Sequence, residues 1–215
     1  AGPNLACVQA RLSIYNPDDS FLTRQFTLEY AALFEAILPA LERLGLPILL
    51  GGTSNHFRRT ALSACCAWDA FNVTEDADLG VRLARQGYSV AMLDSDTWEE
   101  APRSARAWFG QRTRWLKGWM QTYLVHMRDP RRLWRELGAW RFVGVQVMLG
   151  GMLLSALVHP WFFLGAITTV LSGEPLILGG GILWAICWFN FIVGHAIGIV
   201  LGLVSAWRSQ GRIPL

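Results

Sequence analysis

Asn72-Val73-Thr74-Glu75-Asp76-Ala77-Asp78 is the stretch from which the organisation of this chain can be worked out. Thr74 can cap a helix, and the acidic residues after it suit the positive end of a helix dipole. Gly87 can end that helix, and a strand is expected from Tyr88 to Leu93. Acids in a first turn often do no more than stabilise the helix, so this stretch alone does not require a functional site.

Gln111-Arg112-Thr113-Arg114-Trp115 forms a second polar group, just ahead of a long apolar segment. On a helix, Gln111, Arg114 and Trp115 occur at i, i+3 and i+4 and share one face. A guanidinium can hold a diphosphate with two hydrogen bonds, and an indole offers a flat apolar surface to a sugar ring. A helix with Trp and Arg anchors at a membrane interface explains the same residues equally well.

Taken together, these segments resemble a known family. Thr74-Glu75-Asp76 and Gln111 to Trp115 are similar to the TED and Q(Q/R)xRW motifs of processive, membrane-integrated family 2 glycosyltransferases, which include cellulose, chitin and hyaluronan synthases. Gly51 to Arg58 is similar to the loop that lines their donor and acceptor cleft, and Trp98-Glu99-Glu100-Ala101 to a further acidic segment after a strand. The resemblance covers nearly the whole chain.

The resemblance implies an inverting transferase in which Asp76, flanked by Glu75 and Thr74, is the general base for the acceptor hydroxyl. Placing a carboxylate there contributes about a hundred- to ten-thousand-fold in rate. It also implies that Arg114 holds the donor diphosphate and that Trp115 stacks on the acceptor sugar. The full set of substrate-binding residues is expected to be Gly52, Thr53, Ser54, Asn55, Gln111, Arg112, Arg114 and Trp115, with His56 a weaker candidate.

A divalent metal, Mg²⁺ or Mn²⁺, is implied for the complete enzyme, with most of its ligands in a nucleotide-binding half upstream of this chain. Asp18-Asp19 follows Tyr15-Asn16-Pro17, a turn pattern, and is interpreted as a solvated turn, so no metal ligand is assigned here. The chain starts at Ala1 and is expected to be the carboxy-side part of a longer protein, inactive alone. Gly51-Gly52-Thr53 lacks the Gly-Lys-Ser/Thr ending of a P-loop, which argues against ATPase chemistry.

Two long runs, Phe142 to Leu171 and Leu176 to Trp207, contain no Lys, Arg, Asp or Glu. Each exceeds the roughly 20 residues that cross a bilayer, so two transmembrane helices are expected, the first bent or divided at Pro160. Arginines precede the first run and follow the second, whereas the short connection between the runs contains no Lys or Arg. This distribution predicts a multi-pass protein of the inner (plasma) membrane whose catalytic part faces the cytoplasm. The net charge of +3 fits anionic membrane lipid better than nucleic acid.

The predicted fold class is α/β, and the resemblance implies that residues 1–101 are part of a GT-A domain. An amphipathic interface segment is predicted over 102–141, a transmembrane region over 142–207 and a cytoplasmic tail over 208–215. The expected elements are strands near 5–14, 47–50 and 88–93, and helices near 20–44 with a break at Pro39, near 60–64, and from Thr74 onward. The four cysteines lack metal-site spacing and are expected to be reduced packing residues.

Several functions remain open at this stage. The leading one transfers a sugar from a nucleotide sugar, with UDP-glucose the first choice, to a growing polysaccharide or other glycan. A glycolipid synthase that adds one sugar to a lipid acceptor is an alternative. A non-catalytic scaffold or receptor-like protein that keeps the fold is a second alternative. A transporter is disfavoured because neither apolar run carries a charged residue.

Overall fold

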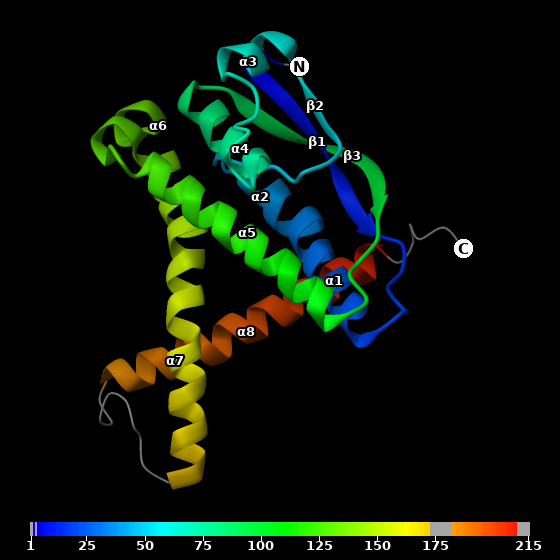
Figure 1. Ribbon diagram of the computed structural model, residues 1–215, viewed down its shortest axis with the longest axis vertical. Coiled ribbons are helices and arrows are strands. Elements are labelled where there is room, and N and C mark those ends of the chain that lie inside the picture. Colours follow the sequence, from blue (N-terminus) through cyan, green and yellow to red (C-terminus); the bar gives the residue numbers. More distant parts are fainter. Residues whose placement is uncertain (1, 3, 173–181, 210–215) are drawn as a thin grey trace.

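The structure is a computed structural model that describes residues 2, 4–172 and 182–209 (Figure 1). Helices make up most of it, and one small sheet lies in the amino-terminal half. The predicted mixed α/β class is therefore confirmed.

The sheet has three strands in the order β2-β1-β3. The central strand, β1 (Leu5–Ile14), pairs antiparallel with β2 (Asn55–Phe57) and parallel with β3 (Ser89–Glu99). Most β1 side chains are buried, as expected for a strand covered on both faces. The β3 strand is longer than predicted, and the acidic segment at its end is paired with the end of β1.

The helix predicted over residues 20–44 consists of three segments: α1 (Phe21–Ala31), the π-helical η1 (Ala32–Ile37) and α2 (Leu38–Arg43). Ser20 caps α1, since its hydroxyl accepts the Thr23 N–H at 3.2 Å. Pro39 has no N–H to donate to the preceding turn, and its ring crowds that turn, which accounts for the change of helical register beside it.

The strand predicted over residues 47–50 is wrong. Ile48 and Leu50 are buried, but this run pairs with no strand in the part of the chain that the structure describes. Instead, helix α4 (Glu75–Arg85) packs directly on the backbone of this run. The two segments are so close that a Cβ at Gly80 would collide with the Ile48 carbonyl. The short helix α3 (Arg59–Ala64) lies between them in sequence and agrees with the prediction.

Helix α4 lies between two hydrophobic cores. Its Leu79 and Leu83 belong to the larger core with β1, α1 and η1, while Val81 and Ala84 belong to a second core. The second core is completed by the following four residues: Leu133, Leu137, Val145 and Leu149. The acidic start of α4 is thus carried by an element that is fixed on both sides.

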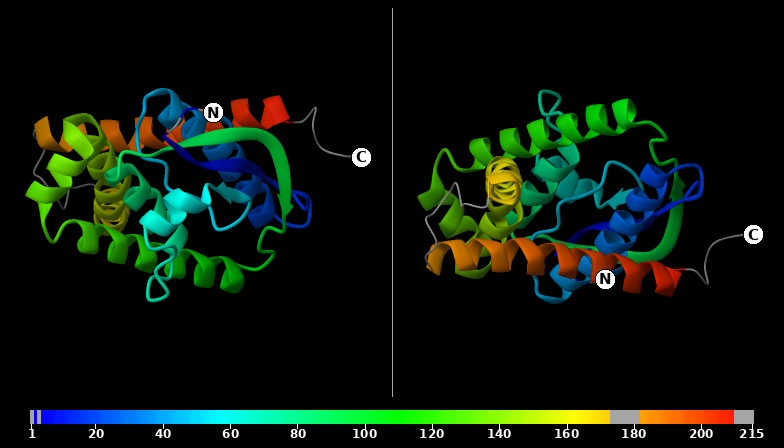
Figure 2. Two further views of the ribbon diagram at one scale, coloured as in Figure 1. Left: turned by 90° about the horizontal axis from the view of Figure 1, so that it is seen from above. Right: turned by 90° about the horizontal axis from the view of Figure 1, so that it is seen from below.

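The carboxy-terminal half is helical. It consists of α5 (Ala105–His126), α6 (Pro130–Val145), the π-helical η2 (Gln146–Gly150), α7 (Gly151–Ser172) and α8 (Ile182–Ser209). Gly138, at φ 74°, kinks α6. Seen from above or below, α5 and α8 run along opposite sides of the domain with α7 end-on between them (Figure 2).

Among the described residues, one helical run, Pro130–Ser172, is long and apolar enough to cross a membrane, and helix α7 in it continues through Pro160. The second predicted span falls partly on residues 173–181, outside the described residues. Its described part forms α8, which packs along α1 and η1: a Cβ at Gly202 would lie 3.3 Å from the Leu28 carbonyl oxygen. Two spans therefore stay a prediction.

Candidate active site

Gln9, a fully buried side chain of β1, holds the loop that starts at Gly51 and Gly52. The Gln9 Nε2 donates to the Thr53 carbonyl at 2.9 Å, and its Oε1 accepts the Gly51 N–H at 2.9 Å. The Asn55 amide also donates to the Gly51 carbonyl. One buried amide thus fixes both ends of this turn.

The same contacts show which predicted loop residues are already engaged. Ser54 adopts φ 56°, and its hydroxyl lies 2.5 Å from that of Thr97 on β3. The side chains of Ser54 and Asn55 therefore bind the protein itself. Gly52 is different, because a Cβ there would lie 3.3 Å from Asp76 Oδ2, which places this backbone directly against the carboxylate.

Asp76 lies in the first turn of α4, and its Oδ1 accepts the Ala77 N–H at 2.7 Å. Burial raises the pKa of Asp76 above the ordinary aspartate value, and nearby Glu75 raises it further. No cation pairs with Asp76 among the described residues. A carboxylate in this state is a stronger proton acceptor than a salt-bridged one.

Thr74 does not cap α4 with its side chain, contrary to the sequence prediction. Asn72 Oδ1 accepts the Thr74 N–H at 3.0 Å instead, in a turn that satisfies the chain just before the helix. The Thr74 hydroxyl is buried and has no hydrogen-bond partner among the described residues. Helix α5 buries this hydroxyl, because its Gly118 lies so close that an added Cβ would be 2.5 Å from Thr74 Cγ2.

The Gln111 to Trp115 motif lies on α5, as predicted, but its side chains differ in role. Arg112 makes two hydrogen bonds to the Glu29 carboxylate, the longer 2.6 Å, and lies 4.7 Å from the centre of the Trp115 ring. Its guanidinium therefore anchors α5 to α1 and covers one face of the indole. Arg114 is exposed and belongs to no ion pair of the described residues, and Gln111 Oε1 is buried there without a partner.

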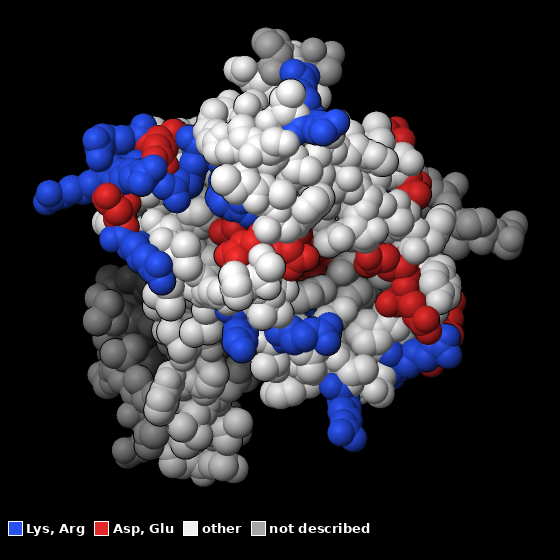
Figure 3. Space-filling view, turned by 45° about the horizontal axis from the view of Figure 1, so that its top comes forward, with Lys and Arg blue, Asp and Glu red and all other residues white. Residues whose placement is uncertain are grey.

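Tyr30 of α1 connects these groups electrostatically. Burial raises its pKa, the carboxylates of Glu99 and Asp76 raise it further, and Arg112 opposes them. Burial also raises the pKa of Glu99, the acidic residue at the end of β3. Residues from α1, β3, α4 and α5 thus lie close to one another. The face of the molecule drawn in Figure 3 has acidic side chains around a recess and basic side chains below it.

No three His, Cys, Asp or Glu side chains cluster in the described residues in a way that could hold a metal ion. The Asp18-Asp19 pair is occupied by arginines, with Asp18 3.3 Å from Arg24 and Asp19 2.8 Å from Arg103. The described side chains therefore do not fit a divalent metal.

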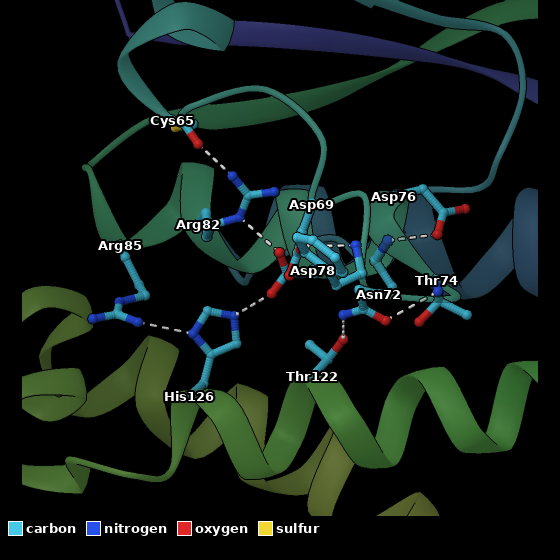
Figure 4. A network of polar contacts seen from close by, with 12 residues as sticks. Cys65, Asp69, Asn72, Thr74, Asp76, Asp78, Arg82, Arg85, Thr122 and His126 are labelled. Carbon is cyan, nitrogen blue, oxygen red and sulfur yellow. Dashed lines mark hydrogen bonds and ion pairs between the residues drawn. The ribbon is translucent and has the colours of Figure 1, made fainter.

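Sequence reasoning missed two residues that organise the site, Gln9 and His126. Gln9 interrupts the apolar run that starts strand β1, which is a detectable pattern. His126 lies in the last turn of α5, and its Nε2 is 3.0 Å from Asp78 Oδ1 (Figure 4). Its partner is distant in the sequence, so nothing local indicated the contact.

Comparison with known proteins adds a family. A family model described as Glycosyl transferase family group 2 matches residues 1–207. A beta-monoglucosyldiacylglycerol synthase of Synechocystis sp. is 30% identical over 156 residues, which are 69% of this chain and 32% of that protein. A glucomannan 4-beta-mannosyltransferase of Arabidopsis thaliana is 31% identical over 119 residues, 54% of this chain and 22% of that protein. The chain thus spans about a third of the length of the first relative and less than a quarter of the second.

Proposed function

The chain belongs to glycosyl transferase family group 2, and on that premise we propose that its site transfers a sugar from a nucleotide sugar to a hydroxyl group of a glycan or lipid acceptor. The observation that carries the proposal is the position of Asp76. Its unpaired, half-buried carboxylate lies against the Gly52 backbone, beside the helix that carries Arg114. The relatives are named as a synthase and a mannosyltransferase, both enzymes, so a non-catalytic scaffold is disfavoured.

The chemistry assigned to these groups is an inverting displacement. Asp76, with Glu75 and Thr74 beside it, takes the proton from the acceptor hydroxyl, whose oxygen attacks the anomeric carbon of the donor sugar. The bond from that carbon to the diphosphate breaks, and the nucleoside diphosphate leaves with the electron pair. Arg114 is assigned to the charge that develops on the diphosphate, and Gln111 to a polar group of the substrate.

Six further loop and helix residues receive narrower roles in this proposal. Gly52 and Thr53 line the cleft by their backbone, and Ser54 and Asn55 shape the loop through the bonds described above. Arg112 holds α5 against Glu29, so its contribution to substrate binding is indirect. Trp115 is assigned to stacking on an acceptor sugar; Arg112 lies over its ring, and Phe26 and Trp119 pack beside it.

Enzymes of this family generally use a divalent metal, which neutralises the diphosphate when bound. The described side chains do not fit such an ion, and the roles above belong to the side chains alone. The donor is proposed to be UDP-glucose. The site is placed at the cytoplasmic face of a membrane because the helical run Pro130–Ser172 contains a segment apolar enough to cross one. The assignment to the processive group and the domain limits are proposed from the motif sequences.

The acceptor divides the proposal into two branches. A growing polysaccharide is supported by Trp115, since a stacked acceptor end suits repeated addition, and by the mannosyltransferase relative. A lipid acceptor is supported by the similarity to the glycolipid synthase, which covers more of this chain.

The test is an assay of the complete protein, with whatever sequence flanks residues 1–215, in membranes supplied with UDP-glucose and Mn²⁺ or Mg²⁺. Release of UDP should fall by at least about a hundred-fold in Asp76→Asn. Asp18→Asn is the matched control, because Asp18 lies in an exposed turn with a side chain 85% accessible. Labelled sugar should appear either in the lipid extract or in insoluble polymer, which identifies the acceptor.

Two outcomes would overturn the proposal. If the wild-type protein releases no nucleoside diphosphate from any nucleotide sugar, the site is not a transferase. If the wild-type protein is active and Asp76→Asn equals Asp18→Asn, another group is the base.

A further inference from the structure

One face of α5 packs against residues that lie just before and just after Asp76 in the sequence. The buried residues of this helix are Gly118, Thr122 and His126, which recur at every fourth position and form a single stripe. Gly118 packs on Thr74, and the Thr122 hydroxyl accepts the Asn72 side-chain amide at 2.8 Å. We call these three residues the α5 stripe.

The third contact of the stripe joins two buried ionisable groups. His126 and Asp78 are each 4% exposed, and their side chains are 3.0 Å apart. The Arg85 Nη1 lies 2.8 Å from His126 Nδ1. Because a guanidinium can only donate, Nδ1 must accept, and the proton of a neutral ring is then on Nε2, which donates to Asp78.

Further partners fix these two groups. Arg82 donates to the other Asp78 oxygen at 2.7 Å. Burial alone would raise the pKa of Asp78, but the hydrogen bonds from His126 and Arg82 outweigh it and lower the pKa. Arg85 also reaches Glu136 of α6 at 2.5 Å, so the network connects α4, α5 and α6. Figure 4 shows its part from Arg82 and Arg85 to Asp78 and His126.

The α5 stripe lies on the same face of the helix as part of the Gln111 to Trp115 motif. Trp115 lies three residues before Gly118, and Gln111 lies four residues before Trp115, so both continue the stripe toward the start of the helix. The partners of the stripe, Asn72, Thr74 and Asp78, lie on either side of Asp76 in sequence. The rotation of α5 that satisfies these contacts is therefore also the rotation that determines where the motif residues lie relative to Asp76.

We propose that His126 and Asp78 are positioning residues, which set the rotation and register of α5 so that Gln111 to Trp115 is presented to the site of Asp76. This inference rests on the proposed transferase function and adds residues to it that touch no substrate. A displacement of about 1 Å in such an element can reduce a rate by about a hundred-fold.

The test uses two substitutions at one position in the complete protein. His126→Leu keeps most of the volume and removes both polar contacts, whereas His126→Gln retains an N–H for Asp78. The control is Thr23→Val, which removes buried hydrogen bonds of α1 far from the stripe. For each variant, kcat and KM per folded enzyme, thermal unfolding, and amide hydrogen exchange over residues 105–126 are measured.

The expected result is a fall in kcat of about ten- to a hundred-fold in His126→Leu. His126→Gln should recover most of it, and Thr23→Val should lose stability with kcat unchanged. Exchange over residues 105–126 should rise in His126→Leu only. Unchanged kcat in His126→Leu, or equal losses in His126→Leu and Thr23→Val, would overturn the inference.

The exchange measurement separates this inference from the proposed function. If the wild-type protein transfers no sugar, the function fails while the exchange data still decide whether His126 seats α5. If the enzyme is active and exchange in His126→Leu matches wild type, the inference fails and the function stands.

Discussion

Replacing Gly118 with alanine directly tests the close packing of α5 on the segment before Asp76. The added Cβ would lie 2.5 Å from Thr74 Cγ2 and 2.8 Å from Thr74 Cβ, whereas non-bonded carbon atoms prefer about 3.5–4.0 Å. One of the two segments must therefore move by about 1 Å. That movement stretches the 2.8 Å hydrogen bond between Asn72 and Thr122.

The magnitude follows from three contributions. Overpacking costs about 1–3 kcal/mol, and a lost hydrogen bond costs about 1 kcal/mol more. Alanine is favoured over glycine inside a helix by about 0.5–1 kcal/mol, which offsets part of the loss. The free energy of unfolding is expected to fall by about 1–3 kcal/mol in Gly118→Ala.

The assay is thermal and denaturant unfolding of the purified protein in detergent. Gly110→Ala is the matched control, because it lies on the same helix and its added Cβ meets nothing within 4 Å. That variant should gain about 0.5–1 kcal/mol from helix propensity alone. If Gly118→Ala proves as stable as Gly110→Ala, α5 is not seated on Thr74 and the reasoning is refuted.

Three further predictions follow. Ala67 has φ 52°, in the left-handed region that disfavours side chains. Ala67→Gly should therefore raise the unfolding free energy by about 1 kcal/mol, whereas Ala64→Gly in helix α3 should lower it by about 0.5–1 kcal/mol. The opposite order of stabilities in denaturant unfolding would contradict this. The pKa of Asp76 is raised and the base must be ionised, so kcat/KM should fall as pH drops through a value above the ordinary aspartate pKa of about 4; an acid limb at or below pH 4 would show that another group titrates. Arg112→Lys cannot bind both Glu29 oxygens in parallel and should lower stability by about 0.5–1 kcal/mol; an unchanged unfolding midpoint would mean that this pair does not anchor α5.

Local patterns in the sequence predicted much of the fold. The alternation of strands and helices, the helix from Glu75 and the helical position of the Gln111 to Trp115 motif follow from periodicity and end signals. The strand predicted at residues 47–50 failed for a physical reason. An apolar run encodes burial, and here the burying partner is helix α4 at Gly80, where a strand was expected to find a neighbouring strand.

The site was less predictable because its decisive contacts are long-range. Asp76 could be nominated from its motif, but the contact with Gly52 and the seating of Gly118 on Thr74 depend on how α4, α5 and the glycine loop pack. The pairing of Arg112 with Glu29 has the same origin. Residue type identified candidates for charge and stacking, whereas only the packing distinguished the engaged guanidinium from the exposed one at Arg114.

The regular spacing of the α5 stripe constrains how the length of this helix can vary. Each residue inserted or deleted between Trp115 and Gly118 turns one part of an α-helix by about 100° relative to the other and shifts it by about 1.5 Å. A single deletion there would carry the motif to a different side of the helix while leaving every contact of the stripe intact. Substitutions in that interval are therefore tolerated far more readily than any change in its length.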